Sequence, residues 1–362
     1  MDRRSFLHSA ALSAIALSAP VVARSAKTTA SQKILVLGGT NFLGPAIVEA
    51  ALSGGHEVTL FNRGVTRPQL FPGTEKLRGD RRNGVHGLSA LGRGRTWDAV
   101  IDVWPADTSM VEASAKLLAE RAEYYFFVSS IAVYRSFARP WVDESAELRL
   151  RESGYGGEKA RAERIVSTLY PERHGVARCP SIFGPRDPGS SLHYWLRNFY
   201  RNDEVLAPGA GDDPVQFVDV RDVARWIVDS AVQKRAGIYN TAAPPIRFAD
   251  FLNMSRIATE SDAKLVWVPK DFLYSQDVEA FTQLPMWIPV NEDPGFFQIS
   301  AKLAHDEGFE TRPPQRTLTA AWRWYQSAFF DDTIFPHNGW GMSNEMQVQL
   351  LSSWHDTQKR GD

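Results

Sequence analysis

The sequence has a single cysteine, Cys179, and almost no excess of charge of either sign. One cysteine excludes a disulfide within the chain. The formal net charge of −1 excludes the strong basic excess that usually marks a broad nucleic-acid surface. The eight histidines show no paired metal-ligand spacing, so no metal site is expected. With 43% hydrophobic and 23% charged residues, the composition indicates a globular protein.

The N-terminal segment has the features of an export signal. Arg3-Arg4-Ser5-Phe6-Leu7 precedes an apolar run at residues 10–19, which is too short and too rich in alanine and serine for a comfortable membrane span. A charged start, a short apolar middle and small residues near position 23 define a signal peptide. The paired arginines resemble a twin-arginine signal, the address of proteins exported after folding. Residues 1–30 therefore predict a periplasmic or extracellular protein; a membrane anchor or a chance basic start is the alternative.

Strands and helices alternate along the next part of the chain. The apolar run at residues 33–37 predicts a buried strand, and a helical stretch and a second strand at 57–61 follow it. Further strands are expected at 76–77, 99–103, 124–129 and 176–179, with helices at 109–121 and 155–169. This alternation predicts the α/β class: a Rossmann-type, doubly wound parallel sheet with a smaller C-terminal substrate lobe.

The pattern loosens after Pro180, which indicates a second region. We expect a dinucleotide-binding domain at 31–180, a substrate-binding lobe at 181–330 and a C-terminal tail at 331–362. A strand at 215–219 and the helix after it are predicted to return to the first domain, so that residues 215–242 belong to it.

A glycine-rich turn joins the first predicted strand to the first helix. Such a turn lets the backbone approach a pyrophosphate, whose charge lies at the helix N-terminus. Asn41 replaces the usual middle glycine, and asparagine tolerates left-handed backbone angles. The strand before the turn and the helix after it favour dinucleotide binding over a merely structural loop. The candidate cofactor-binding residues here are Gly38, Gly39, Thr40, Asn41, Phe42, Leu43 and Gly44.

Cofactor type is expected to depend on the end of the second strand. NAD-binding proteins carry an acidic residue there, whereas this chain has Asn62 and Arg63. An arginine suits the 2′-phosphate of NADP, so NADP is favoured over NAD; an exposed loop arginine without a role is the alternative. Asp80 follows the third strand, where it could accept a hydrogen bond from the adenine amino group.

A catalytic set is indicated by Tyr155 and Lys159. Their spacing of four residues places both side chains on one face of a helix. A tyrosine that acts as a base near neutral pH needs its pKa lowered, and a neighbouring ammonium group lowers it. Ser130 ends the preceding strand and is the candidate that holds the substrate oxygen.

Together, the segments 38–44, 128–134 and 155–159 resemble the extended short-chain dehydrogenase/reductase family, in its NAD-dependent epimerase/dehydratase branch. The resemblance covers about residues 33–330. It implies an NADP or NAD cofactor and an epimerase or related oxidoreductase that acts on a sugar or sugar nucleotide. Because free nicotinamide cofactors are not expected to be plentiful outside the cytoplasm, the cofactor of an exported protein is expected to be tightly bound. The resemblance also implies that Ser130, four residues before Tyr134, is catalytic rather than Ser129, and that backbone near Pro180 meets the nicotinamide.

Two departures from the family pattern and two rival functions remain open. Asn41 replaces a glycine, and Asp102-Val103-Trp104 stands where small residues usually face the cofactor.

A reductase of a small carbonyl substrate is one alternative function. An RNA-binding protein on the same fold, like the chloroplast stem-loop binding proteins, is another. The expected partners are a small-molecule substrate and the twin-arginine export machinery; a homodimer is left open, and no nucleic acid is expected.

Overall fold

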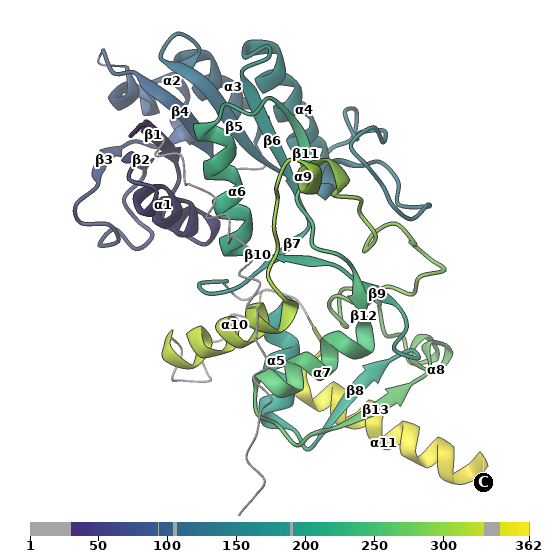
Figure 1. Ribbon diagram of the computed structural model, residues 1–362. Helices are drawn as coiled ribbons and strands as arrows, with labels where there is room; N and C mark the ends of the chain where they lie inside the picture. Colours follow the sequence, from purple (N-terminus) through teal and green to yellow (C-terminus); the bar gives the residue numbers. More distant parts are fainter. Residues whose placement is uncertain (1–29, 93, 104–106, 189–190, 329–340, 362) are drawn as a thin grey trace, which may run out of the picture. The chain divides into compact units, whose positions relative to one another are not determined.

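The computed structural model describes residues 30–92, 94–103, 107–188, 191–328 and 341–361 (Figure 1). The predicted signal sequence, including Arg3 and Arg4, lies outside these residues. Trp104 and residues 331–340 also lie outside them. No helix in the described part of the chain is both long and apolar enough to span a bilayer.

A seven-stranded sheet forms the first part of the molecule, with the strand order β11-β6-β5-β4-β1-β2-β3. Every neighbouring pair in it is parallel. The strands are β1 (Lys33–Leu37), β2 (Glu57–Asn62), β3 (Glu75–Arg78), β4 (Trp97–Asp102), β5 (Ala122–Ser130), β6 (His174–Cys179) and β11 (Gly237–Asn240). The predicted α/β class and Rossmann-type parallel sheet are confirmed.

Helices cover both faces of this sheet (Figure 1). Successive side chains of a strand point to opposite faces, so Ile34 and Val36 join the core under α1 (Leu43–Ser53) and α6 (Val220–Val232). Leu35 and Leu37 join the core under α3 (Thr108–Leu118) and α4 (Tyr155–Leu169). A strand buried on both faces needs apolar residues throughout, which explains the continuous apolar run at 33–37. Short helical segments complete this part: η1 (Arg81–Asn83), α2 (Gly84–Gly87), η2 (Ser89–Leu91), η3 (Ile131–Val133) and α9 (Lys302–Asp306).

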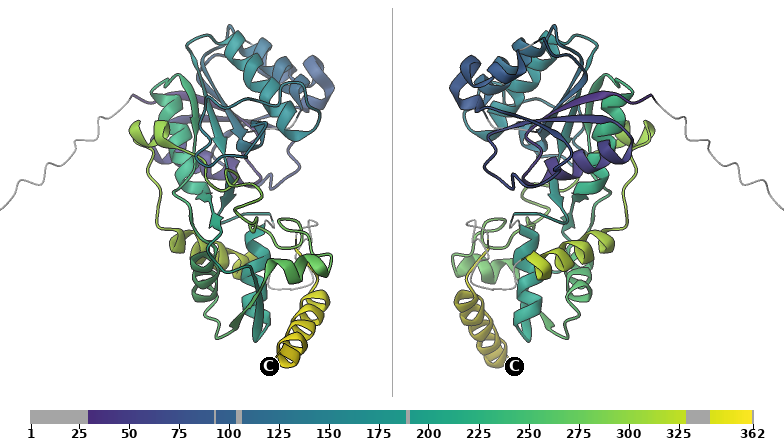
Figure 2. Two further views of the ribbon diagram at one scale, coloured as in Figure 1. Left: turned by 90° about the vertical axis from the view of Figure 1, so that its right-hand side faces the viewer. Right: turned by 90° about the vertical axis from the view of Figure 1, so that its left-hand side faces the viewer.

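A second hydrophobic core lies around the two-stranded parallel sheet of β8 (Glu204–Pro208) and β13 (Lys264–Val268). It includes the fully buried side chains of Trp195 and Trp287, so many of the aromatic residues of the C-terminal half serve packing. The helices around it are α5 (Ser191–Arg201), α7 (Phe248–Ala258), α8 (Lys270–Ser275), α10 (Pro314–Ala328) and α11 (Asn344–Gly361). Leu350 and Leu351 attach α11, yellow in Figure 2, to this core, so the described part of the predicted tail is a packed helix.

The segment 215–219 differs from the single strand that was predicted. It forms β9 (Pro214–Val215), which pairs with β12 (Ile246–Arg247), and β10 (Phe217–Asp219), which pairs with β7 (Ser181–Phe183). The break is at Gln216, whose buried amide donates to the carbonyls of Ala243 and Ile299 and accepts from the Ile299 amide, at 2.8–2.9 Å. Of the segment expected to return to the sheet, β11 joins it and α6 covers it. The domain boundaries stay a prediction.

Candidate functional site

A pocket of about 850 Å³ lies at the carboxyl ends of the parallel strands. In an open α/β sheet, ligands bind in this crevice. The pocket brings together all of the predicted site residues, from the glycine turn to the proposed catalytic set. These are Gly38, Gly39, Thr40, Asn41, Phe42, Leu43, Gly44, Asn62, Arg63, Asp80, Ser130, Tyr155, Lys159 and Pro180.

Close packing explains the glycines of the turn. Gly38 and Gly39 have φ angles of 120° and 92°, which side-chain-bearing residues rarely adopt. A Cβ atom at Gly44 would lie 2.6 Å from the Gly39 Cα, so only glycine lets α1 begin against the turn. Phe42 provides no side-chain cap for α1, which leaves first-turn N–H groups for an anion. The left-handed geometry that was expected at Asn41 is not observed, because Gly38 and Gly39 already supply the change of direction.

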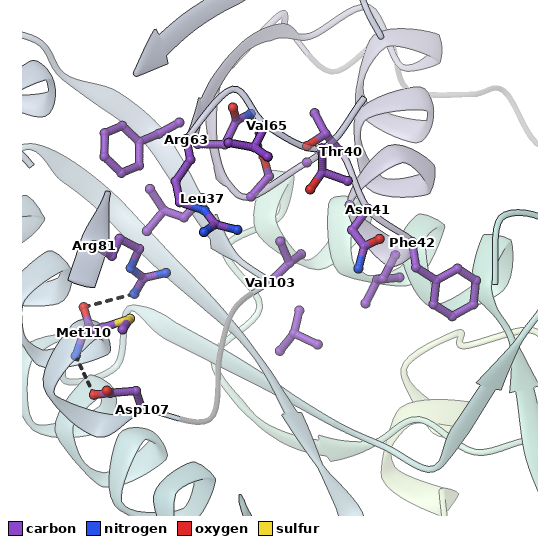
Figure 3. Close-up of a pocket in the computed structure, with 18 of the residues that line it drawn as sticks. Leu37, Thr40, Asn41, Phe42, Arg63, Val65, Arg81, Val103, Asp107 and Met110 are labelled. Atoms are coloured by element: carbon purple, nitrogen blue, oxygen red, sulfur yellow. Dashed lines mark hydrogen bonds between the residues drawn. The ribbon is translucent and has the colours of Figure 1, made fainter. Parts of the chain in front are cut away.

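Asn62 and Arg63 have different roles at the end of β2. The Asn62 side-chain amide donates to the Gly38 carbonyl at 3.1 Å, and its oxygen accepts from the Gly64 amide at 2.8 Å. Asn62 therefore braces the glycine turn, a role that sequence reasoning did not identify. Arg63 is exposed and reaches into the space bordered by Leu37, Thr40 and Val103 (Figure 3). Its charge is placed to meet an anionic ligand group.

Asp80 is already engaged by a neighbour that the sequence did not single out. Its carboxylate accepts from the backbone and the guanidinium of Arg82, including one contact of 2.5 Å. The Arg82 hydrogen bond, aided by the charge of Arg63, lowers the pKa of Asp80 to about 2. Asp80 is thus a carboxylate at neutral pH, and an adenine amino group would share it with Arg82.

A buried ion pair, with Arg81 in the pocket wall, was also missed by sequence reasoning. Arg81 donates to both carboxylate oxygens of Asp102, at 2.6 and 2.8 Å, and Tyr125 donates to the same carboxylate at 2.6 Å. The side chain of Asp102 is fully buried, and Val103 lines the pocket instead. In the segment where small residues usually face the cofactor, the charged side chain of Asp102 is therefore turned to Arg81. The run Arg78-Gly-Asp-Arg-Arg was the only sequence signal for this ion pair, but Asp102, the partner of Arg81, lies 21 residues further along the chain.

Ser130, Tyr155 and Lys159 converge from β5 and α4. A Cβ atom at Gly156 would lie 2.1 Å from the Ala132 carbonyl oxygen, so glycine lets the start of α4 pack against η3. Burial raises the pKa of Tyr155, and a hydrogen bond with Ser130 opposes this shift. The buried Lys159 amine donates to the Val128 carbonyl at 2.7 Å and lies 5.9 Å from the centre of the Tyr155 ring. Its pKa is lowered to about 8 by burial.

The two adjacent serines differ in their partners. The Ser129 hydroxyl donates to Glu163, which is itself paired with the buried Arg178 at 2.8 Å. Ser130 instead accepts from the Ala132 amide and hydrogen-bonds to Tyr155. This arrangement favours Ser130 as the serine that meets a substrate.

The chain is similar to known proteins in sequence and fold. It is 26% identical over 211 residues to the chloroplast stem-loop binding protein of 41 kDa b from Arabidopsis thaliana. That match covers 54% of each chain, so it spans about half the length of this relative.

Solved structures match over most of the chain. The UDP-glucose 4-epimerase of Thermotoga maritima, solved with UDP-glucose, is 17% identical, with a TM-score of 0.59 over 82% of this chain and 99% of that one. The UDP-glucuronic acid 4-epimerase of Bacillus cereus, solved with NAD, is 16% identical, with a TM-score of 0.62 over 84% and 100%. At these identities the likeness shows the fold. The model of the NAD dependent epimerase/dehydratase family matches residues 34–242, and the chain therefore belongs to this family.

Proposed function

We propose that this protein is an NAD(P)-dependent epimerase, or a related oxidoreductase, that acts on a sugar or sugar nucleotide. The observation that carries the proposal is the single pocket that joins a phosphate-binding turn to Ser130, Tyr155 and Lys159. Both solved neighbours described above are sugar-nucleotide epimerases by name, one bound to a sugar nucleotide and the other to NAD.

The described residues fit a nicotinamide dinucleotide. The N–H groups at the start of α1 and the turn around Gly38 would bind its pyrophosphate, because the helix N-terminus favours an anion there. Lys159 would hydrogen-bond the nicotinamide ribose. Arg63 would meet a 2′-phosphate, which makes NADP the favoured cofactor. A bound nicotinamide would supply the hydride acceptor and donor for the reaction.

Tyr155 would move the accompanying proton. In the pocket as it stands, burial raises the pKa of this tyrosine, so the hydroxyl is protonated at neutral pH. Lowering a tyrosine pKa from about 10 towards 7 requires the tyrosinate to be stabilised by roughly 4 kcal/mol relative to the neutral side chain. The Lys159 ammonium supplies part of it, and the positive charge of an oxidised nicotinamide supplies more. Ser130 would hold the substrate oxygen, so that the same hydroxyl can accept the proton and return it.

The experiment measures dinucleotide content after denaturation, together with turnover of UDP-sugars in cofactor-free buffer. An epimerase returns the hydride to the same carbon, so we expect bound dinucleotide in the purified protein and turnover without added cofactor. An empty protein that works only with excess NAD(P)H would instead be a reductase of a small carbonyl substrate.

Binding of a nucleic-acid stem-loop is the second candidate, and the Arabidopsis relative is the observation that favours it. The formal net charge of −1 argues against it, because nucleic-acid affinity depends largely on cationic contacts to phosphate. Titration with a stem-loop RNA at two salt concentrations separates the candidates. Tight, salt-sensitive binding in a protein without sugar turnover would favour the second.

A further inference from the structure

The loop at residues 63–74, between β2 and β3, touches both ends of the glycine turn. At one end Asn62, which precedes the loop, donates to the Gly38 carbonyl at 3.1 Å. At the other end Arg67 Nη1 donates to the Asn41 carbonyl at 2.7 Å. Between these two anchors, Val65 and Thr66 line the same pocket as the turn (Figure 3). The loop, which we call the strap, therefore borders the pocket beside the glycine turn, and hydrogen bonds to Gly38 and Asn41 hold its first part there.

Arg67 is held by more than this one bond. Its guanidinium lies 5.8 Å from the ring centre of Trp324 on α10, so it also connects the turn to the second core. Its backbone has a φ of 42°, a left-handed conformation that costs free energy for a residue other than glycine. A strained residue persists where surrounding contacts hold it. At Arg67 these contacts include Asn41, Trp324 and a hydrogen bond from the Leu70 amide to the Arg67 carbonyl at 3.1 Å.

The electrostatics around Arg67 favour an anion nearby. Burial lowers the pKa of Arg67, and the positive charge of Arg186 lowers it further. Arg186 itself pairs with Glu49 on α1 at 2.7 Å. Two arginines are thus brought close to the turn and the helix that would bind a pyrophosphate, and an anion there would relieve their repulsion.

We propose that the 63–74 loop retains the dinucleotide and that Arg67 is the positioning residue that fastens it, by its bond to the Asn41 carbonyl. Arg67 does not line the pocket, so it acts through the turn and through Val65 and Thr66 rather than by contact with the ligand. On this proposal, release of a dinucleotide would require the strap to move away from the glycine turn, and that movement would break the Arg67 contacts. This inference rests on the proposed function for the identity of the ligand.

The test compares Arg67→Ala with Lys76→Ala, a matched control. The Lys76 amine donates to the Pro68 carbonyl of the same loop at 2.8 Å. Lys76→Ala therefore also removes a cation that donates to a backbone carbonyl, but this carbonyl lies outside the glycine turn. Dissociation of NADPH and of NADH is followed by stopped-flow fluorescence on the full chain. We expect dissociation to be roughly tenfold faster in Arg67→Ala, the factor associated with a lost charge-assisted bond, and unchanged in Lys76→Ala. Arg67→Lys, which can still donate to the turn, should recover part of the retention.

Hydrogen exchange of the 63–74 amides without any dinucleotide provides a second, ligand-independent measurement. We expect faster exchange in Arg67→Ala than in Lys76→Ala. Unchanged exchange, unchanged dissociation, or an equal effect of both substitutions would overturn the inference and leave the proposed function standing. A protein that binds neither dinucleotide would overturn the proposed function and the retention role, while the exchange measurement would still decide whether Arg67 anchors the loop.

Discussion

At Tyr155 the proposed chemistry depends on one hydroxyl group. The hydroxyl hydrogen-bonds to Ser130, and Lys159 lies beneath the ring. Tyr155 is 52% exposed, but partial desolvation in the pocket still raises its pKa, so the hydroxyl is protonated in the pocket as described and can donate a proton. In the proposed reaction it would become a base only when the positive charges of Lys159 and the cofactor lower its pKa.

We expect Tyr155→Phe to retain the fold and dinucleotide affinity while turnover falls by roughly 10²–10⁴-fold, the usual contribution of a positioned acid or base. Steady-state turnover on the accepted sugar nucleotide, with a parallel dinucleotide titration, measures both effects. Tyr200→Phe is the control, because Tyr200 is a similarly exposed tyrosine in the second core region, 59% against 52% for Tyr155. A loss of less than about tenfold in Tyr155→Phe would contradict the assignment.

Arg63 is the residue on which we propose that cofactor choice depends. Its exposed guanidinium reaches into the pocket from the end of β2 (Figure 3). Because a charge-assisted contact to a 2′-phosphate is strong, we expect Arg63→Ala to weaken NADP binding by roughly tenfold or more. NAD lacks this phosphate, so its affinity should stay constant and serves as the internal control. Calorimetric titration of cofactor-free protein measures both, and tighter binding of NAD than NADP by the unsubstituted protein would refute this role.

At the scale of elements, helix α4 has one side in the proposed active site and another side in a buried ion pair. Tyr155 and Lys159 line the pocket, while Glu163 is buried against β6, where it pairs with Arg178. Arg178 also donates to the Tyr134 hydroxyl at 3.1 Å, and Tyr134 in turn donates to Asn240 on β11 at 2.6 Å. With the Ser129–Glu163 hydrogen bond, the network therefore ties α4 to β5, β6 and β11 and sets the position of the proposed catalytic side chains.

Glu163→Gln should lower the free energy of unfolding by about 3–5 kcal/mol, because it leaves the Arg178 charge buried without its carboxylate. Urea unfolding followed by circular dichroism measures the change. Glu112→Gln is the matched control, since Glu112 pairs with Lys116 on the exposed face of α3 at 2.5 Å. Exposed pairs are worth about 0–1 kcal/mol. Equal, small changes in the two variants would show that the buried pair does not hold α4 in place.

At the scale of the whole molecule, the predicted location of the protein bears on its reaction, because the location sets the supply of free cofactor. Free nicotinamide cofactors are not expected to be plentiful outside the cytoplasm. A protein exported in the folded state could carry a bound dinucleotide, and an epimerase would regenerate it in place. Export and the proposed epimerase chemistry are therefore mutually supporting hypotheses.

Replacing Arg3 and Arg4 by lysine should leave the full-length precursor in the cytoplasm, because the paired arginines are the expected address of the twin-arginine pathway. Cell fractionation followed by immunoblotting measures the location and size of the protein, with the unsubstituted chain as control. Normal processing and export of the double variant would reject this pathway.

The sequence alone determined the elements whose signals are local. The apolar run at 33–37 and the glycines after it were sufficient to predict β1, the turn and α1, since a strand buried on both faces and a crowded turn each leave a short, recognisable pattern. The spacing of Tyr155 and Lys159 likewise placed both side chains on one face of a helix that is observed at Tyr155–Leu169.

Only the tertiary structure decided which polar groups meet. Asn62 donates to Gly38, and Arg67 donates to Asn41. Arg81 forms an ion pair with Asp102. Of the two adjacent serines, Ser129 donates to Glu163, whereas Ser130 hydrogen-bonds to Tyr155. The same holds for Gln216, whose partners Ala243 and Ile299 lie 27 and 83 residues away and split a predicted strand into two. The spacing of apolar residues along one element shows which of its faces is buried, because each residue favours or resists burial without regard to a particular partner. A hydrogen bond or ion pair needs two groups at a set distance, and folding alone brings distant groups to that distance.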